Sequence, residues 1–301
     1  MKKIVLILLF LLPVSALVMV SLARYYDEKD FRRQLDEAAD REEELRTEID
    51  NLENDLLFKG GELARRESQV MHSRSRSQIL EGYIEARADN PQIKIAYITI
   101  DDGPSTLSGE LLDVLIQKNV PATFFVVGSE NPALTKYYKR IVEDNHVLAN
   151  HSYHHDYSNI YSSKDEFWKD VELQNVFLAN FTDKPITLFR FPGGSENPQP
   201  LKYGGGPAMM AELESELGEK GYIYHDWNVF PDDVSAKSKP VSELVQRVKE
   251  QVYYRKNVTI LLHDHPWNLT TPEALGQMID FLRADGYIIL PLSENSVPIR
   301  F

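Results

Sequence analysis

The sequence predicts an α/β domain, because short apolar runs alternate with segments of helical periodicity from about residue 93 onward. About seven such runs recur, a number that fits either a barrel or a doubly wound parallel sheet. Titratable residues follow directly after several runs, at the strand ends where both folds carry their chemistry. The runs lie at 93–100, 122–127, 147–149, 187–191, 222–229, 258–263 and 287–290, with helical patterns that include 111–118, 164–180, 209–219, 241–254 and 272–284.

Composition limits the classes of function. The chain has 301 residues, of which 26% are charged and 43% hydrophobic, as in ordinary globular proteins. Its formal net charge of -13 argues against a general nucleic-acid partner. It contains no cysteine, which excludes thiolate metal sites, disulfides and cysteine nucleophiles.

The N-terminus predicts a membrane anchor over residues 1–23. Lys2 and Lys3 precede an uncharged apolar run at 4–23, whose length suits a spanning helix better than a cleaved signal peptide. The basic residues place the N-terminus in the cytoplasm and the remainder outside the cell, in a single-pass cell-membrane protein. Small residues at Ser21 and Ala23 leave cleavage open.

Residues 24–90 are expected to form a helical stalk and linker, before a domain at 91–301. A nearly regular heptad seam is consistent with a coiled coil and a homodimer through the stalk. A single solvated helix stabilised by charge pairs is the equal alternative. Gly60 and Gly61 end the pattern. The seam consists of Phe31, Leu35, Ala38, Glu42, Leu45, Ile49, Leu52 and Leu56, with Glu42 as its flaw.

The residues after the strands form a candidate metal and acid–base site. Asp101 and Asp102 end the first run, and adjacent carboxylates are costly unless a cation or shared proton offsets their repulsion. His151 and His155 are four residues apart, so a helical turn would face both imidazoles the same way. Two imidazoles and one carboxylate make a three-ligand site with a position open for water. His154, at i+3, is an alternative to His155.

Five separated motifs resemble those of carbohydrate esterase family 4, the polysaccharide deacetylases. The resemblance spans about residues 93–292 and implies a distorted (β/α) barrel of about seven strands. Ile100 stands where Phe is usual, and the fourth motif is loose because Val234 stands where Trp is common. The motifs are Thr99-Ile100-Asp101-Asp102-Gly103-Pro104, His151-Ser152-Tyr153-His154-His155, Arg190-Phe191-Pro192-Gly193-Gly194, Trp227-Asn228-Val229 leading to Asp233, and Leu261-Leu262-His263.

The resemblance implies a role for each matched residue. Asp102, His151 and His155 would bind one divalent metal ion, with zinc expected and cobalt or another ion as alternatives. Asp101 would be the general base and His263 the general acid. Arg190 would orient the base, and Asp233 would tune the acid. The backbone N–H of Gly193 would stabilise the oxyanion, and Leu261 would line the acetyl pocket. Two alternatives to this tuning role of Asp233 stay open. The neighbouring Asp232 could tune the acid instead, or Asp233 could form a purely structural ion pair.

The departures concern the substrate groove. Gly193 replaces an aromatic residue that is common after Pro192, and Val234 removes a Trp, so a more open groove is expected. Tyr153 and Trp227 are candidate sugar-binding surfaces, together with Tyr157 and Trp267. Such a groove would suit a long polymer.

These expectations converge on a membrane-tethered, metal-dependent hydrolase that removes N-acetyl groups from a cell-envelope polysaccharide. Peptidoglycan is the expected substrate, because the domain would face the cell wall. The alternatives are an O-acetyl esterase with the same site, an iron-dependent oxygenase with two-His-one-carboxylate coordination, and a stalked, non-enzymatic glycan-binding scaffold. The oxygenase would need neither Asp101 nor His263 as an acid–base pair.

Overall fold

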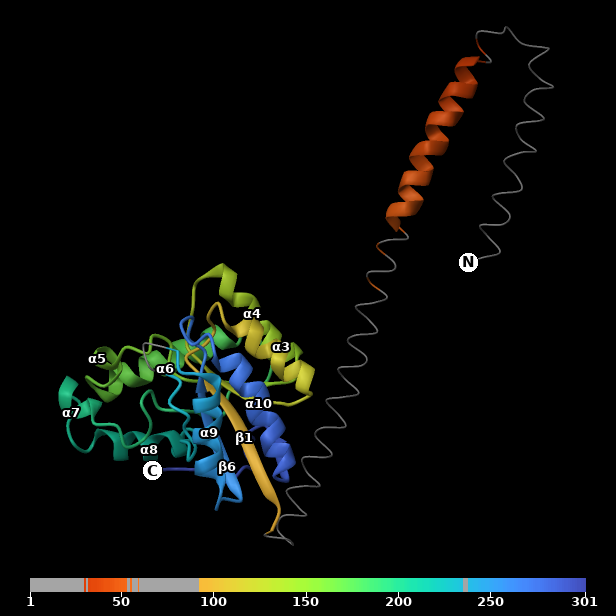
Figure 1. Cartoon of the computed structure of the whole chain (residues 1–301). Helices are drawn as coiled ribbons and strands as arrows, with labels where there is room; N and C mark the ends of the chain where they lie inside the picture. Colours follow the sequence, from red (N-terminus) through yellow and green to blue (C-terminus); the bar gives the residue numbers. More distant parts are fainter. Residues whose placement is uncertain (1–29, 31, 53–54, 56–58, 60–91, 235–237) are drawn as a thin grey trace. The chain divides into compact units, whose positions relative to one another are not determined.

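The computed structural model describes residues 30, 32–52, 55, 59, 92–234 and 238–301 (Figure 1). The chain divides into two compact units, Met1–Ser68 and Gln69–Phe301. None of the helices among the described residues is long and apolar enough to cross a bilayer. The predicted membrane span at 4–23 and the linker at 62–90 lie outside those residues, so both stay predictions.

In the first unit, residues 32–52 are helical, in agreement with the expected stalk. The described apolar positions of the seam are open to solvent, with Leu35, Leu45, Ile49 and Leu52 between 43% and 61% exposed. The helix also carries internal charge pairs, such as Arg46 to Glu42 at 2.8 Å. An exposed apolar stripe suits a coiled coil, and the charge pairs suit a lone helix, so both alternatives stay open.

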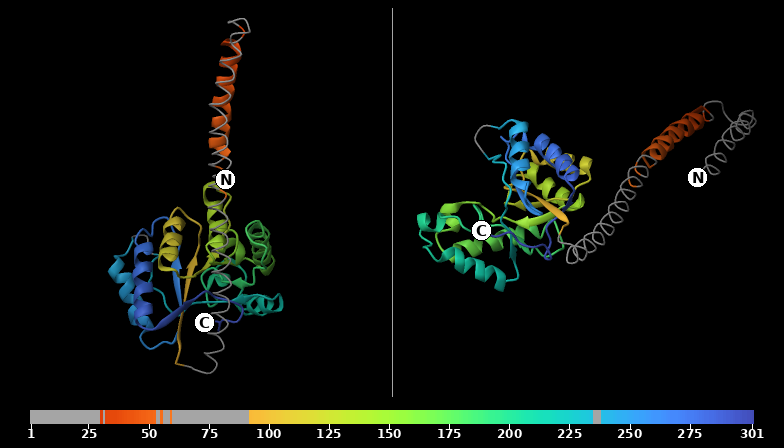
Figure 2. Two further views of the ribbon diagram at one scale, coloured as in Figure 1. Left: turned by 90° about the vertical axis from the view of Figure 1, so that its right-hand side faces the viewer. Right: turned by 60° about the horizontal axis from the view of Figure 1, so that its bottom comes forward.

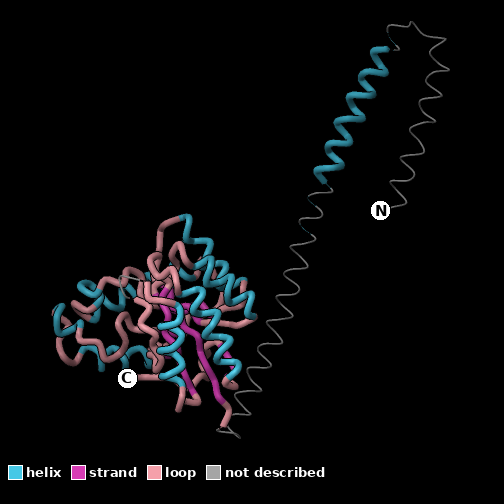
Figure 3. Tube along the Cα trace, viewed as in Figure 1, coloured by secondary structure: helices cyan, strands magenta, loops and turns pink. Residues whose placement is uncertain are grey.

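The second unit is built on seven parallel strands that form one sheet, the centre of the domain in Figure 3. The strands are β1 (Lys94–Asp101), β2 (Thr123–Val126), β3 (Val147–Asn150), β4 (Leu188–Phe189), β5 (Ile223–Tyr224), β6 (Asn257–His263) and β7 (Tyr287–Leu290). Their order is β5-β4-β3-β2-β1-β6, and β7 pairs with the first half of β1. Seven parallel strands were predicted. The sheet is a half-barrel, whereas a distorted barrel was expected. Strands β5 and β6 lie at opposite ends of the strand order and form no ladder with each other among the described residues, although an isolated bridge connects Val229, in the chain after β5, to Ile260 of β6.

Helices cover the outside of the sheet (Figures 1 and 2). They are α3 (Ser108–Lys118), α4 (Pro132–Glu143), α5 (Tyr157–Ile160), α6 (Lys164–Leu178), α7 (Gln199–Tyr203), α8 (Met209–Glu219), α9 (Val241–Val252) and α10 (Thr271–Ala284). Helix α10 packs between α9 and α3, and α3 contacts α4, so these four helices form one continuous layer.

The alternation of side chains along β1 separates a helix-facing core from the site. Ile98 and Ile100 belong to the large core that α3, α9 and α10 share. Ile95 and Tyr97 belong to a second cluster, on the opposite face, with residues of β2, β3 and β4. Asp101, two and four residues after Thr99 and Tyr97, therefore lies on the face away from Ile100. The Phe-to-Ile departure in the first motif is a change in the helix-facing core.

The observed elements follow the predicted ones closely where the apolar pattern is long. The bounds of β7 and α8 coincide with the predictions, but β4 and β5 are only two residues long. Both strands end early because the following residues leave the ladder to take up positions at the site. Helix α4 was not singled out from the sequence, although Asn131 caps it and Pro132 occupies its first turn.

Two glycines test this packing in opposite directions. Gly218 is an exposed residue within α8, and a Cβ there would meet no heavy atom within 4 Å. Gly218→Ala should raise the free energy of unfolding by about 0.5–1 kcal/mol, because alanine loses less backbone entropy in a helix. A Cβ on Gly205 would lie 2.6 Å from the Tyr161 carbonyl oxygen, so Gly205→Ala should lower it by about 1–3 kcal/mol. Urea titration measures both, and equal effects would contradict the packing.

Candidate active site

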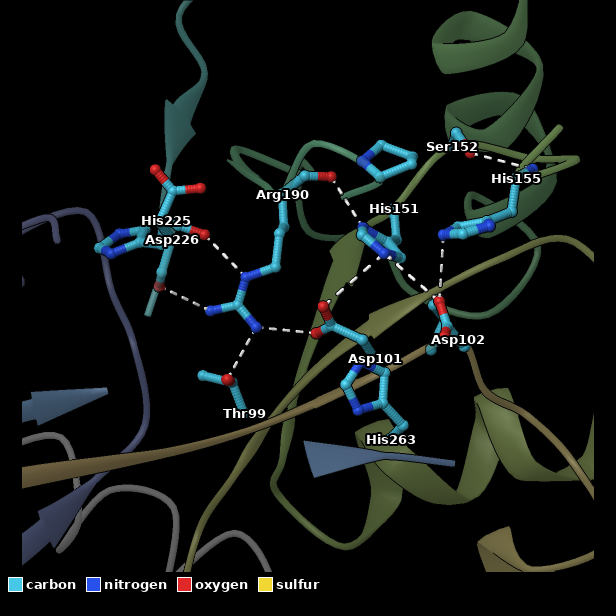
Figure 4. A network of polar contacts seen from close by, with 12 residues as sticks. Thr99, Asp101, Asp102, His151, Ser152, His155, Arg190, His225, Asp226 and His263 are labelled. Carbon is cyan, nitrogen blue, oxygen red and sulfur yellow. Dashed lines mark hydrogen bonds and ion pairs between the residues drawn. The ribbon is translucent and has the colours of Figure 1, made fainter. Parts of the chain in front are cut away.

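The parallel register brings the predicted site residues to one edge of the sheet (Figure 4). Asp101 and His263 are direct neighbours in the pairing of β1 with β6. Strand β3 ends one residue before His151, and β4 ends one residue before Arg190. Because carboxyl ends of parallel strands share one edge, residues far apart in the sequence meet there.

A fully buried guanidinium holds Asp101. The Nη1 group of Arg190 donates to Asp101 Oδ1 at 2.8 Å and to Thr99 Oγ1 at 2.7 Å. Its Nε and Nη2 groups donate to the carbonyl oxygens of His225, at 2.7 Å, and Asp226, at 2.9 Å. Arg190 is 0% and Asp101 2% exposed, so this ion pair lies in the interior, where removal of either partner would leave a buried charge.

Asp102, His151 and His155 form a group that could hold a metal ion. One donor atom of each lies within 4.8 Å of the other two. Asp102 Oδ1 is 3.4 Å from His151 Nε2 and 3.3 Å from His155 Nε2, and this buried oxygen has no hydrogen-bond partner among the described residues. An orphaned carboxylate oxygen facing two imidazole nitrogens is the arrangement that a cation completes. The residues present therefore fit a divalent ion.

The loop after β3, and not a helix, positions the two histidines. The predicted helical turn is wrong: residues 151–156 are non-helical, and Ser152 and His155 have φ angles of 67° and 53°. Ser152 N donates to Asn150 Oδ1 at 2.8 Å, and His155 N donates to Ser152 Oγ at 3.1 Å. His151 Nδ1 lies 2.8 Å from the Arg190 carbonyl oxygen, to which it donates, so its Nε2 keeps a lone pair toward Asp102.

The electrostatics of the group favour an ionised carboxylate and a neutral His155. Burial would raise the pKa of Asp102, but contacts with His151 and His265 hold it well below its usual range. Burial, and then the charge of His151, lower the pKa of His155 to about 4. Burial would lower the pKa of His151, but Asp101 and Asp102 raise it. A carboxylate and neutral imidazoles are the forms that bind metal ions.

The structure separates His155 from the neighbouring histidine alternatives. The Nδ1 atom of His154 pairs with Asp170, and the His154 side chain is 53% exposed. His154 therefore lies outside the candidate ligand group. His265 contacts the group from the other side, because its Nε2 lies 2.9 Å from Asp102 Oδ2.

His263 is paired with Asp233 and not with Asp232. Asp233 Oδ1 lies 2.9 Å from His263 Nδ1, and Asp233 Oδ2 accepts from the His263 backbone N–H at 3.0 Å. Asp232 binds Lys239 at 2.7 Å instead. Burial would lower the pKa of His263, but Asp233 raises it. A raised pKa favours the protonated imidazole, which is the form that a general acid requires.

The remaining predicted residues lie at varying depths. Gly193 is exposed, with a φ of 83°, and within the described part of the chain its N–H has no acceptor. Leu261 is buried on β6, two residues before His263. The ring of Tyr153 packs on Phe177, with 5.5 Å between ring centroids. The backbone N–H of Gly193 is therefore free to donate a hydrogen bond. The ring of Tyr153 has a packing contact that a sugar-binding role would not need.

Two further contacts concern Trp227. Its ring packs edge-on against Phe301, with 5.0 Å between centroids, and it lies 5.7 Å from the guanidinium of Arg190. The indole thus contributes to the wall around the buried ion pair, and its proposed contact with a sugar stays a prediction.

Several residues of the site were missed from the sequence. Thr99 holds the guanidinium of Arg190, and Asp170 accepts from the backbone of the histidine loop at His154 N. The side chain of Asp226 accepts from the N–H of Ser195, at 2.9 Å, just after the predicted oxyanion loop. Of these, Thr99 stands in the first motif and Asp226 lies within the fifth predicted run, at 222–229, but neither position indicated a contact. All three residues act through partners that the fold alone brings near.

His225 gives a pH-dependent test of the interior behind Arg190. It is 0% exposed, neither ring nitrogen has a hydrogen-bond partner within the described part of the chain, and burial lowers its pKa from 6.5 to about 3. Because the unfolded chain binds this proton more readily, the free energy of unfolding should fall as the pH drops from about 6.5 toward 3. His225→Phe removes that loss, by up to about 1.4 kcal/mol per pH unit. Denaturant titrations of both proteins across this range measure it, and parallel stability curves would contradict the assignment.

Comparisons with known proteins agree with this geometry. A sequence profile described as polysaccharide deacetylase matches residues 88–204. A putative polysaccharide deacetylase of Bacillus subtilis is 29% identical over 69% of this chain and 70% of its own length. A peptidoglycan-N-acetylglucosamine deacetylase of Bacillus cereus is 27% identical over 72% of this chain and 76% of its own.

A solved structure extends the likeness to the fold. The catalytic domain of a peptidoglycan N-acetylglucosamine deacetylase from Eubacterium rectale superposes with a TM-score of 0.65 and is 34% identical. The match covers 70% of this chain and 94% of that domain. The chain belongs to the carbohydrate esterase family 4 of polysaccharide deacetylases.

Proposed function

We propose that this protein is a metal-dependent hydrolase that removes N-acetyl groups from a cell-envelope polysaccharide, with peptidoglycan amino sugars as the substrate. One observation carries the proposal. A buried Asp101–Arg190 pair, an orphaned oxygen of Asp102 and a His263–Asp233 pair meet at one strand edge. The names of the Bacillus cereus and Eubacterium rectale relatives support the choice of substrate.

Each residue has a separate task in amide hydrolysis. A divalent ion held by Asp102, His151 and His155 would polarise the acetamide carbonyl and lower the pKa of a water molecule. Asp101 accepts the proton of the attacking water, and Arg190 pairs with this carboxylate and orients it. The N–H of Gly193 donates to the developing oxyanion.

His263 completes the reaction by protonating the departing amine. An amide needs this proton because an amide anion is a very poor leaving group. Asp233 holds the Nδ1 side of the imidazole, which leaves Nε2 to carry the proton toward the substrate. The same residues argue against an oxygenase, which needs no such acid–base pair. An O-acetyl ester needs less help from His263, so the site itself does not exclude an esterase.

The identity of the ion belongs to the proposal. Two imidazoles and one carboxylate with an open position are a common ligand set for catalytic zinc. Zinc is therefore the proposed ion, and cobalt or another divalent ion is expected to substitute for it.

The location of the protein also belongs to the proposal. The uncharged run at 4–23 behind Lys2 and Lys3 supports a single-pass anchor with the catalytic domain outside the cell. The exposed seam of Leu35, Leu45 and Ile49 supports a homodimer through the stalk. Retention in the membrane fraction after an alkaline wash tests the anchor. Light scattering of the detergent-solubilised protein tests the dimer, and a monomer would favour the lone helix.

Acetate release tests the proposed reaction itself. Purified protein loaded with zinc should release acetate from an N-acetylated chitooligosaccharide or from peptidoglycan, and a chelator should abolish the release. Asp101→Asn should lower kcat/KM by about 10²–10⁴-fold, because it removes the general base. Asp232→Asn is the matched control, since Asp232 pairs with Lys239 at the surface. An absence of acetate from any wall glycan, with zinc bound, would overturn the proposal, and undiminished glycan binding by Asp101→Asn would then favour the scaffold.

The pH dependence of the reaction tests the role of His263 as the general acid. Because Asp233 raises the pKa of His263, Asp233→Asn should lower that pKa. The general acid must be protonated, so the alkaline limb of the kcat profile should move to lower pH. An ester substrate should be less sensitive than an amide to the loss of His263 in His263→Ala. An unmoved alkaline limb would assign Asp233 a purely structural role.

A further inference from the structure

The two oxygens of the Asp102 carboxylate have different environments. Oδ1 is buried, has no hydrogen-bond partner in the ranges that the structure describes, and faces the Nε2 atoms of His151 and His155. Oδ2 lies 2.9 Å from His265 Nε2. The family motifs end at His263, so His265 has no role in the mechanism described above.

His265 is not a member of the ligand group. Only Asp102, His151 and His155 have donor atoms within 4.8 Å of one another among the described residues. The side chain of His265 is 24% exposed, and its Nε2 lies 2.9 Å from Oδ2 of the Asp102 carboxylate. A donor in this position contacts a metal-binding group without contacting the ion.

Two neighbouring rings fix the plane of the His265 imidazole. Trp267 stacks on one side, with ring centroids 4.4 Å apart and planes 16° apart. His263 is nearly parallel to it, with centroids 5.9 Å apart and planes 7° apart. The backbone carbonyl of Trp267 accepts from Ser238 Oγ at 2.7 Å, which ties down the loop that carries the indole. The imidazole therefore has little freedom to turn away from Asp102.

We propose that His265 is a positioning residue for the metal site, which donates from Nε2–H to Asp102 Oδ2 and presents Oδ1 alone to the ion. A carboxylate can bind an ion through one or both oxygens, and a hydrogen bond on one oxygen favours binding through the other. Outer partners of this kind orient the ligand, and their loss costs about 10–100-fold in metal affinity. The inference rests on the proposed function only for the presence of a divalent ion.

Zinc affinity of the full chain, measured by competition with a chromophoric chelator, tests the role of His265. His265→Phe keeps a ring to stack on Trp267 but removes the donor, so the dissociation constant should rise about 10–100-fold. His265→Gln keeps an N–H donor and should restore most of the affinity. His154→Gln is the control, because His154 pairs with Asp170 outside the ligand group. The absorption spectrum of the cobalt-loaded protein should change in His265→Phe and not in His154→Gln.

The melting temperature of each metal-free variant separates a lost contact from a lost fold. If His265→Phe does not fold, His265→Asn, which is too short to reach Oδ2, takes its place. An unchanged dissociation constant for zinc in the folded variant would overturn the inference. Zinc binding without acetate release would remove the proposed reaction and leave the inference standing, whereas a wild-type protein that binds no divalent ion would overturn both.

Discussion

The buried ion pair between Arg190 and Asp101 is the interaction on which the site depends. The guanidinium spans β1, β4 and the chain after β5, because it donates to Thr99, to Asp101 and to two backbone carbonyls. The backbone carbonyl oxygen of Arg190 accepts a hydrogen bond from the Nδ1–H of His151. One side chain thus fixes the base, and its backbone fixes the tautomer of a candidate metal ligand. Loss of the Arg190 side chain would leave the carboxylate of Asp101 uncompensated in the interior.

This arrangement explains how two adjacent carboxylates coexist at a strand end. Side chains alternate along β1, so Asp101 turns toward the interior cation, while Asp102 has left the strand with a φ of 72° and faces the imidazoles. Asp101 pairs with the guanidinium of Arg190, and Asp102 faces the imidazoles of His151 and His155, so the two carboxylates have separate partners. The proposed division of labour into base and ligand therefore follows from where the strand ends.

The sequence was most informative where structure and chemistry are local. Long apolar runs predicted β1, β6 and β7, and the residues that follow the strands predicted the membership of the site. The geometry of the histidine loop was not predictable, because the spacing of His151 and His155 suits a helical turn as well as a loop with two left-handed residues. The contact of His265 with Asp102 joins residues that are far apart in the sequence. It depends on the pairing register of β1 with β6, which hydrophobic periodicity does not encode.

The central claim is that Asp101 is a base that stands apart from the metal ligands. Zinc dissociation constants of Asp101→Asn and Asp102→Asn, measured on metal-free protein under the same conditions, test it most directly. Asp102→Asn should lose most of its affinity for zinc, whereas Asp101→Asn should bind zinc within a few-fold of the wild-type protein. An equal loss of zinc affinity in both variants would make Asp101 a ligand and would rule out its separate role as the base.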